Sequence, residues 1–401
     1  MNNTFQKKLL KITEDNNYRE LKCSNGIDFS SNDYLGLSNH PKIKEAIIKA
    51  MNTGTSIGST GSRLLTGSKK EHMELEEFAA EYFNSQACLF FSSGFLANYS
   101  LFTTLPDRHD FIIYDELIHA SVRDGIRASE AKSLKFKHND LDSLKEQIKK
   151  AKELKADSIW ISIESVYSMD GDFADISGVL EIIKPYNNIY LVIDEAHATG
   201  IFGVEGKGFS FDLRSRSGNC LPPAPLEGEG LERGDSRLAR QHDNIIALHT
   251  CSKALGVSGA LICASKEIVE YLINKSRPFI YTTAESPLIA VAVKEALMIS
   301  QNEPQHREKL LELVEYTHNN YLNFAYLPSP LAGEGRVRGT QIIPIVLNDS
   351  LQALNKAFEL QSKGFDVRAI RPPTVVSARL RISLNANRTK GEIDRLFEVI
   401  R

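Results

Sequence analysis

Cysteine is scarce in this chain of 401 residues, and no two cysteines form a Cys-x-x-Cys pair. The five are scattered along the sequence, at Cys23, Cys88, Cys220, Cys251 and Cys263. An odd, scattered set argues against a disulfide framework and against a cysteine-ligated zinc site. We therefore expect a reduced, cytoplasmic protein without a bound metal.

Long apolar runs and a large excess of one charge are also missing. No apolar stretch approaches the roughly 20 residues of a membrane span, and the start of the chain, residues 1–8, has no apolar core of a signal peptide. The formal net charge of −3 gives no overall case for nucleic-acid binding. The composition, 42% hydrophobic and 25% charged, is that of a globular chain long enough for one large and one small domain.

Between residues 41 and 300, short apolar runs alternate with stretches of helical spacing. The apolar runs predict strands at 87–91, 110–114, 158–163, 189–194, 245–249 and 259–263. The helical spacing predicts helices at 41–51, 70–83, 95–104, 119–130, 140–153 and 176–185. This alternation predicts a large α/β domain over 41–300 whose mainly parallel sheet is covered by helices on both faces.

The remaining segments follow other patterns. Residues 1–40 form an N-terminal segment that begins with an amphipathic helix over 1–16. Residues 301–401 predict a small α+β domain, with helices at 303–324, 351–363 and 389–400 and strands at 342–347, 366–370 and 379–384. Two aperiodic segments, 214–241 and 328–339, share the text Pro-Leu-x-Gly-Glu-Gly and are expected to be surface loops, the first an insertion that folding does not require.

Two strand ends carry groups that complement one another chemically. Asp194 ends the apolar run 190–193, and Lys253 follows the apolar run 245–248 in the text Thr-Cys-Ser-Lys. A buried acid is costly without a cationic partner, and ligands of open α/β sheets collect at the carboxyl ends of strands. Pyridoxal phosphate needs both groups, because a lysine amine forms an imine with its aldehyde and an acid keeps its ring nitrogen protonated.

Other strand ends offer weaker signals. Gly94 lies in the turn 92–98 that opens a helix, where free backbone N–H groups can bind phosphate. His119 follows one strand and could stack on a flat ring, and Ser168 follows another, although both also suit ordinary helix starts and turns. His197 completes an Asp-Glu-x-His text that resembles helicase and metal motifs, but no phosphate loop precedes it and no second metal-spaced histidine accompanies it.

Taken together, these motifs resemble the α-oxoamine synthases, a family of fold-type I pyridoxal-phosphate enzymes. The resemblance covers nearly the whole chain apart from the two aperiodic segments. The text that carries it stands at 28–37, 58–63, 92–95, 168–172, 194–200, 250–253 and 371–375. It implies the fold-type I α/β architecture, with a large domain built on a mainly parallel sheet between helices and a small C-terminal α+β domain.

The resemblance also implies which residues carry out catalysis. Lys253 would hold the cofactor and later act as acid and base. Asp194 would pair with the ring nitrogen, His119 would stack on the ring, and His197 would bond the ring hydroxyl. These four are the expected catalytic residues.

Further contacts are implied for the cofactor and the substrate. The cofactor would also be bound by Gly94, Phe95, Ser168 and Thr250 and, across the interface of a homodimer, by Thr282 and Thr283. The expected substrate contacts are Ser62, Thr374 and Arg381. Arg381 would bind the amino-acid carboxylate as a bidentate fork, with Arg379 as the fallback.

The reaction implied is the condensation of an amino acid with an acyl thioester, with loss of carbon dioxide. The text at 30–33 and 371–374 favours the members that join L-alanine to a pimeloyl thioester in biotin biosynthesis. Two alternatives stay open: a sibling that uses glycine, such as glycine acetyltransferase or 5-aminolevulinate synthase, and a non-catalytic chain that only binds the cofactor. The sequence does not distinguish coenzyme A from a carrier protein as the acyl carrier.

Two local features bear on the substrate. Glycine-restricted members can carry threonine where this chain has Ser62, so serine leaves space for the methyl group of alanine. Between Val375 and Ala378 the chain has only two residues, where the family usually has a longer turn. A shorter turn could displace Arg379 and Arg381, and a small misplacement of a carboxylate clamp can cost about 100-fold in rate.

Overall fold

The computed structural model describes most of the chain. The described residues are 3–15, 18–21, 23, 25–214, 244–322 and 339–401. The two surface loops predicted at 214–241 and 328–339 lie almost wholly outside these ranges.

The chain forms two compact units. The large unit comprises Asn32–Ser168 and Asp172–Lys309. The small unit comprises Met1–Ser31, Met169–Gly171 and Leu310–Arg401. None of the described helices combines the length and the apolarity needed to cross a membrane.

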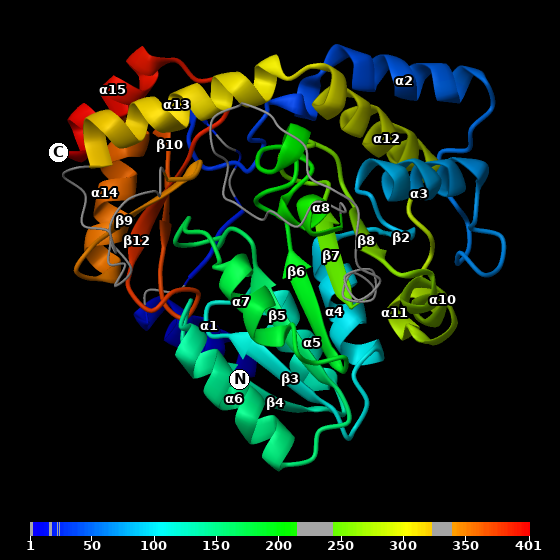
Figure 1. The fold of residues 1–401 in the computed structure, drawn as a ribbon. Coiled ribbons are helices and arrows are strands. Elements are labelled where there is room, and N and C mark those ends of the chain that lie inside the picture. The colour runs from blue at the N-terminus through cyan, green and yellow to red at the C-terminus, as the bar shows by residue number, and fades with distance from the viewer. Residues whose placement is uncertain (1–2, 16–17, 22, 24, 215–243, 323–338) are drawn as a thin grey trace, which may run out of the picture. The chain divides into compact units, whose positions relative to one another are not determined.

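The large unit is built on a seven-stranded sheet with the order β2-β8-β7-β6-β5-β3-β4 (Figure 1). The strands are β2 (Ala87–Phe91), β3 (Phe111–Asp115), β4 (Lys132–Phe136), β5 (Ile159–Glu164), β6 (Ile189–Asp194), β7 (Ile245–Thr250) and β8 (Ala260–Ala264). β8 runs antiparallel to both of its neighbours, and the other neighbouring pairs are parallel. The predicted mainly parallel sheet is therefore confirmed.

Helices cover both faces of this sheet, because alternate side chains of each strand enter different apolar clusters. On β3, Ile112 packs in one cluster with side chains of α4 (Gly94–Thr104) and α5 (Ala120–Ala128). Its neighbours Phe111 and Ile113 pack in the other, with α6 (Leu141–Glu153) and α7 (Ile176–Ile183). The other helices of this unit are η1 (Leu37–Asn39), α2 (Pro41–Asn52), α3 (Lys70–Tyr82), η2 (Val204–Gly206), α8 (Phe209–Arg214), α10 (Lys266–Lys275), α11 (Arg277–Ile280) and α12 (Pro287–Asn302).

The small unit contains two short sheets. In one, β12 (Arg379–Ser383) lies between β11 (Arg368–Ile370) and β9 (Ile342–Val346), antiparallel to both. In the other, β1 (Ile27–Asp28) pairs in parallel with β10 (Phe365–Asp366). The helices are α1 (Thr4–Glu14), α14 (Ser350–Ser362), α15 (Lys390–Ile400) and most of α13 (Gln305–Tyr321).

Most strands and helices predicted from the sequence are confirmed at nearly the predicted positions. The strand predicted at 366–370 is instead two strands, β10 and β11, in different sheets, and several elements of the large unit were missed. β4 lies at the edge of the sheet and buries only Phe136 of its five residues, so it contains no apolar run. α12 is apolar on most of its circumference, with nine buried residues, so it shows no helical period. α10 and α11, between β8 and α12, were not predicted either.

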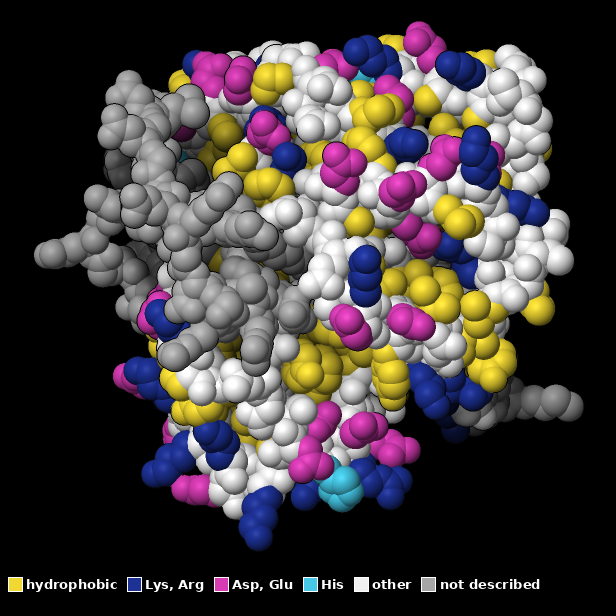
Figure 2. Space-filling model, turned by 45° about the vertical axis from the view of Figure 1, so that its right-hand side comes forward, with side chains coloured by type: hydrophobic (Ala, Val, Ile, Leu, Met, Phe, Trp, Pro, Cys, Tyr) yellow, Lys and Arg dark blue, Asp and Glu magenta, His cyan; other side chains and the backbone are white. Residues whose placement is uncertain are grey.

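The surface mixes charges of both signs. Figure 2 shows basic and acidic side chains interspersed on one face, with hydrophobic side chains gathered in patches among them. No broad field of one charge is visible on this face, as the small net charge of the sequence predicts.

Candidate active site

Five strands of the large unit end at one edge of its sheet. These five, β2, β3, β5, β6 and β7, run in the same direction as the edge strand β4, so the residues that follow them are brought together there. These ends carry the glycine turn at Gly94, the His119 segment, the Ser168 segment, Asp194 and the Lys253 segment. The β/α order thus places most of the predicted cofactor residues on one edge.

Lys253 and His197 are in direct contact. The Nζ atom of Lys253 lies 2.7 Å from Nε2 of His197, and Nδ1 of the same imidazole lies 2.7 Å from the hydroxyl of Tyr34. That hydroxyl donates to Oδ1 of Asn32 at 2.9 Å. The imidazole is therefore held from both sides, and a polar chain runs from the lysine amine to the segment before α2.

Asp194 ends β6 and is almost fully buried, with 5% of its surface exposed. Its Oδ2 accepts a hydrogen bond from Nδ2 of Asn98 at 2.7 Å, and its Oδ1 accepts one from the backbone N–H of Ala196 at 2.9 Å. In the described part of the chain no ion pair joins this carboxylate to a cation. A buried carboxylate in this state favours a cationic ligand group such as a protonated ring nitrogen.

His119 is fixed at the start of α5. Its Nδ1 accepts from the backbone N–H of Ser121 at 3.2 Å and lies 2.7 Å from the hydroxyl of that serine. Asn98 donates to the same hydroxyl at 3.1 Å, so His119 and Asp194 share one hydrogen-bond network. Burial lowers the pKa of His119, which favours the neutral imidazole.

The turn between β2 and α4 has the form of a phosphate cradle. Ser93 caps α4, its hydroxyl accepting from the backbone N–H of Leu96 at 3.2 Å. A Cβ atom on Gly94 would come within 2.7 Å of Oγ1 of Thr250, so only glycine lets the end of β7 lie this close to the helix start. Phe95 is about half exposed at this turn. A helix N-terminus with a nearby hydroxyl suits a phosphate group.

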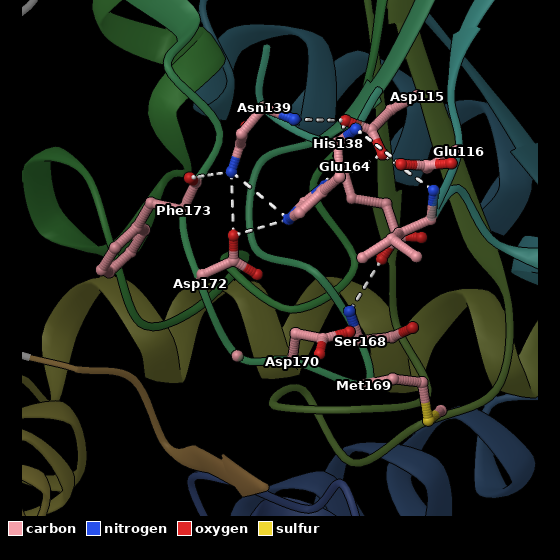
Figure 3. Close-up of polar contacts among 12 residues, drawn as sticks. Asp115, Glu116, His138, Asn139, Glu164, Ser168, Met169, Asp170, Asp172 and Phe173 are labelled. Atoms are coloured by element: carbon pink, nitrogen blue, oxygen red, sulfur yellow. Dashed lines mark hydrogen bonds and ion pairs between the residues drawn. The ribbon is translucent and has the colours of Figure 1, made fainter. Parts of the chain in front are cut away.

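Glu164 ends β5, where it is the register partner of Asp194 on β6. Its Oε2 accepts from the backbone N–H of Ser168 at 3.0 Å (Figure 3), whereas Oε1 is buried without a partner among the described residues. Burial, reinforced by the negative charge of Asp194, raises the pKa of Glu164 to about 8. Its carboxyl is therefore largely protonated near neutral pH.

His138 joins two of these strand ends. Its Nδ1 lies 3.0 Å from Oδ1 of Asp115, at the end of β3, and its Nε2 lies 2.8 Å from Oδ2 of Asp172 (Figure 3). Asn139 adds hydrogen bonds to both carboxylates, at 3.0 and 2.8 Å. Burial alone would lower the pKa of His138, but the hydrogen bonds to the two carboxylates outweigh it and raise the pKa to about 10. We call Asp115, His138, Asn139 and Asp172 the His138 clamp.

Glu195, the second acid of the Asp-Glu-x-His text, has a different environment. It is fully buried, and its carboxylate accepts from the hydroxyl of Ser165 at 2.7 Å and from the backbone N–H of Ser210 at 2.6 Å. Burial raises its pKa. These contacts fix the segments after β5 and η2, so Glu195 supports the fold around the site.

The loop with Ser62 and the segment with Thr282 and Thr283 belong to the large unit but carry none of the contacts above. Ala284 donates its N–H to the carbonyl of Gly61 at 2.9 Å, which links the two segments. Thr282 and Thr283 are exposed and line a cavity together with Arg63. The hydroxyl of Ser62 makes no hydrogen bond to any residue that the structure describes.

Thr374, Arg379 and Arg381 lie in the small unit, so the structure does not position them against Lys253. Nη1 of Arg379 pairs with Oδ1 of Asp170 at 2.6 Å and donates to the carbonyl of Met169 at 3.0 Å. Arg381, two residues along β12, donates to the hydroxyl of Ser383 at 2.7 Å. Thr374 is exposed, in the segment before the short turn.

The residues at the sheet edge fit pyridoxal phosphate in three respects. The Lys253 amine lies beside an imidazole, the Asp194 carboxylate has no ion pair with a cation among the described residues, and the Gly94–Thr250 contact forms a cradle at a helix start. All of these groups belong to the large unit.

Comparison with known proteins establishes the family. A family model described as aminotransferase class I and II matches residues 24–400. The chain belongs to this family. The predicted membership of the α-oxoamine synthase group within it is supported by relatives named 8-amino-7-oxononanoate synthase. Those of Hydrogenovibrio crunogenus and Nitrosomonas europaea are each 35% identical over 93% of this chain and cover 86% and 88% of their own lengths.

Solved structures agree with the fold. The 8-amino-7-oxononanoate synthase of Francisella tularensis is 29% identical, with a TM-score of 0.72 over 94% of this chain and 96% of that one. A serine palmitoyltransferase of S. paucimobilis, solved with bound pyridoxal phosphate and myriocin, has a TM-score of 0.80 over 98% of this chain and 95% of that one. At 21% identity it shows the fold alone. The fold-type I prediction is confirmed.

Within this family fold, sequence reasoning gave no role to three groups of the site. Asn98, on α4, donates a hydrogen bond to Asp194. The one sequence feature that could have pointed to it is an amide on a largely apolar helix. Tyr34 bonds His197 across 163 positions, and the His138 clamp joins residues 23 and 34 positions apart. No local pattern marks contacts of that range.

Proposed function

We propose that this chain is an 8-amino-7-oxononanoate synthase that condenses L-alanine with a pimeloyl thioester. The bond formed joins the alanine Cα to the acyl carbonyl carbon, and the products leaving are carbon dioxide and the free thiol. The observation that carries the proposal is the 35% identity, over 93% of the chain, to synthases of that name. The geometry at the sheet edge supports it.

We propose pyridoxal 5'-phosphate as the cofactor, held by the residues at the sheet edge. When bound, it withdraws electrons from the amino-acid Cα and so makes its proton acidic. Asp194 holds the ring nitrogen protonated, and the Asn98 and Ala196 donors keep its carboxylate oriented. His119, whose orientation is fixed by Ser121, would stack on the ring.

Lys253 holds the cofactor and moves the substrate proton. Because the Tyr34 hydroxyl donates to Asn32, Nδ1 of a neutral His197 donates to Tyr34, and Nε2 at 2.7 Å can accept a hydrogen bond from the Lys253 amine. An amine in this setting can take the proton from Cα and return it later, which is general base and acid catalysis by one group.

The phosphate end involves Gly94, Phe95 and Thr250, with Ser168 toward the ring. The Ser168 backbone is fixed by Glu164, so the neutral carboxyl side chain acts as a positioning residue. Because Glu164 is protonated near neutral pH, it adds no second negative charge beside Asp194.

Arg381 is the proposed ligand of the alanine carboxylate, and Thr374 and Ser62 complete the substrate contacts. Arg379 stays the fallback, and its guanidinium is paired with Asp170. A bidentate guanidinium fork matches a carboxylate. This assignment rests on the family resemblance.

We also propose a homodimer in which Thr282 and Thr283 contact the phosphate of the partner subunit's cofactor. Large hydrophobic side chains are exposed near these segments, including Leu65 at 80%, Tyr281 at 71% and Phe95 at 48%. Exposed apolar groups of this size favour burial in an interface. The cytoplasm is the proposed location.

Product identification tests the proposal. The purified protein, saturated with pyridoxal phosphate, is incubated with L-alanine or glycine and with pimeloyl or acetyl thioesters of coenzyme A and of acyl carrier protein. We expect 8-amino-7-oxononanoate from alanine with a pimeloyl thioester. Faster turnover of glycine with a shorter acyl group would assign the chain to a glycine-using sibling. Absence of any condensation product would favour a non-catalytic binding chain.

A further inference from the structure

A cluster of metal-binding side chains lies in the large unit, outside the site described above. Nε2 of His40 and Nε2 of His306 each lie 3.7 Å from the same atom, Oε2 of Glu303. The three ligand atoms all fall within 4.8 Å of one another. His40 immediately precedes α2, Glu303 caps the end of α12, and His306 lies in the first turn of α13.

The spacing in this cluster differs from that of a hydrogen-bonded one. At 3.7 Å, both imidazole nitrogens are too far from Oε2 for a hydrogen bond. Ligands of a tetrahedral zinc ion lie about 2.0–2.1 Å from the metal, which puts neighbouring ligand atoms roughly 3.4 Å apart. The two histidine–carboxylate separations of 3.7 Å come close to that edge length, and the two imidazole nitrogens lie within 4.8 Å of one another, so modest side-chain movements would let the three groups share an ion.

The carboxylate of Glu303 has its two oxygens in different environments. Oε1 accepts from Nζ of Lys42 at 2.8 Å, and this hydrogen bond lowers the pKa of Glu303. Oε2 faces the two imidazoles and accepts one bond, at 3.2 Å, from the exposed side chain of Gln305. Only 13% and 26% of the His40 and His306 side chains are exposed, so both rings are largely fixed by packing.

We propose that His40, Glu303 and His306 form a binding site for a divalent transition-metal ion of the zinc type. Two imidazoles and one carboxylate are a ligand set that zinc accepts, and a water molecule would complete the tetrahedron. Calcium and magnesium, which prefer oxygen ligands, are disfavoured by the two nitrogens. The ion would tie the start of α2 to the connection between α12 and α13 and so stabilise the large unit.

The ammonium group of Lys42 competes with a bound metal. It holds Oε1 of Glu303 and places a positive charge beside the proposed ion, and 58% of this side chain is exposed. Removing that charge should therefore strengthen metal binding, whereas it would only weaken a network of ion pairs. The effect of removing the Lys42 charge therefore distinguishes a metal site, which it strengthens, from a surface salt-bridge cluster, which it weakens.

The test is titration of the EDTA-treated, dialysed full-length protein with zinc chloride by calorimetry, and with cobalt chloride by visible absorbance. We expect one zinc ion per chain at this site, a tetrahedral cobalt spectrum, and a higher Tm with zinc. His40→Gln, Glu303→Gln and His306→Gln should each weaken zinc binding at least tenfold, and Lys42→Met should strengthen it several-fold.

The matched control is His109→Gln, which removes an exposed histidine outside the cluster. It should leave zinc affinity unchanged, and circular dichroism checks that each variant is folded. The absence of zinc binding to the unmodified protein would overturn the proposal. Equal zinc affinity in the three cluster variants and the control would also overturn it. Loss of zinc binding in Lys42→Met would overturn it too.

Discussion

Glu164 shows how burial decides the charge of a single residue. The side chain is 2% exposed, its Oε1 has no partner in the described chain, and Asp194 is its neighbour in the sheet. Ionising it would put two carboxylates side by side in a low-dielectric environment. The folded protein therefore binds a proton at Glu164 that the unfolded chain releases above its ordinary pKa near 4.5.

The first prediction concerns this proton. Between about pH 4.5 and pH 8 the folded state binds more protons at Glu164 than the unfolded state, so stability falls as the pH rises through that range. Glu164→Gln mimics the neutral carboxyl and keeps an oxygen for the Ser168 N–H, so this part of the pH dependence should vanish. Urea unfolding of the cofactor-free protein at several pH values measures it. If the free energy of unfolding depends on pH in the same way in both proteins, Glu164 does not carry this proton.

The second prediction concerns amino-acid choice at Ser62. Ser62→Thr adds one methyl group in a place where the family resemblance puts the substrate Cα. A buried methyl group is worth roughly 1 kcal/mol, so kcat/KM for alanine should fall several-fold to about a hundredfold while kcat/KM for glycine is largely spared. Ser62→Ala is the matched control and should keep the preference for alanine. An equal loss for both amino acids would mean that Ser62 only supports its loop.

At the scale of the elements, the site depends on how the loops after the strands are joined. His138, after the edge strand β4, contacts Asp115, the last residue of β3 before the loop that leads to His119, and Asp172 in the loop that follows Ser168. Removing the cation would leave two acids together, one of them with only 1% of its side chain exposed. We therefore expect the clamp to position both loops for the cofactor.

The third prediction tests the clamp with His138→Asn. Loss of the charge-assisted hydrogen bonds should lower the free energy of unfolding by about 2 kcal/mol and weaken cofactor binding about tenfold, measured by urea unfolding and by cofactor titration. In the unmodified protein the contribution of His138 is complete below its ordinary pKa of 6.5 and is lost as the pH rises toward about 10. His109→Asn is the surface control. If His138→Asn lowers stability but leaves cofactor affinity unchanged, the His138 clamp supports folding and does not position the cofactor loops.

The sequence predicted those elements whose signal is local. Apolar runs and helical spacing located β2, β3, β5, β6, β7 and β8 and the helices between most of them. β4 and α12 were not predicted, because an exposed edge strand and a helix that is apolar on most sides show no clear hydrophobic period. Their existence follows from tertiary packing.

The candidate site likewise contains residues that the sequence predicted and partners that it did not. Asp194, Gly94, His119 and Lys253 were predictable because the end of a parallel strand is both a sequence feature and a place in space. The partners that fix them were not, since Asn98 and Asp194 are 96 positions apart and Lys253 and His197 are 56 apart. The pairing of Arg379 with Asp170 is likewise non-local, and it bears on which arginine serves the substrate.

At the scale of the whole molecule, the proposed active site draws on segments from most of the large unit. We propose that residues from Tyr34 to Lys253, spread over most of the large unit, form a single pyridoxal-phosphate site at the carboxyl edge of the sheet, with Lys253 holding the cofactor. The other proposed roles follow from that attachment point, because the ring, the phosphate and the substrate are all placed relative to it.

Borohydride reduction of the cofactor-loaded protein, followed by peptide mass mapping, tests this claim most directly. The account predicts a pyridoxyl group on Lys253, and no label in Lys253→Ala, which should still bind the cofactor weakly through phosphate contacts but lose turnover. Lys266→Ala, at the exposed start of α10, is the matched control and should be labelled like the unmodified protein. A pyridoxyl group on any lysine other than Lys253 in the unmodified protein would contradict the account.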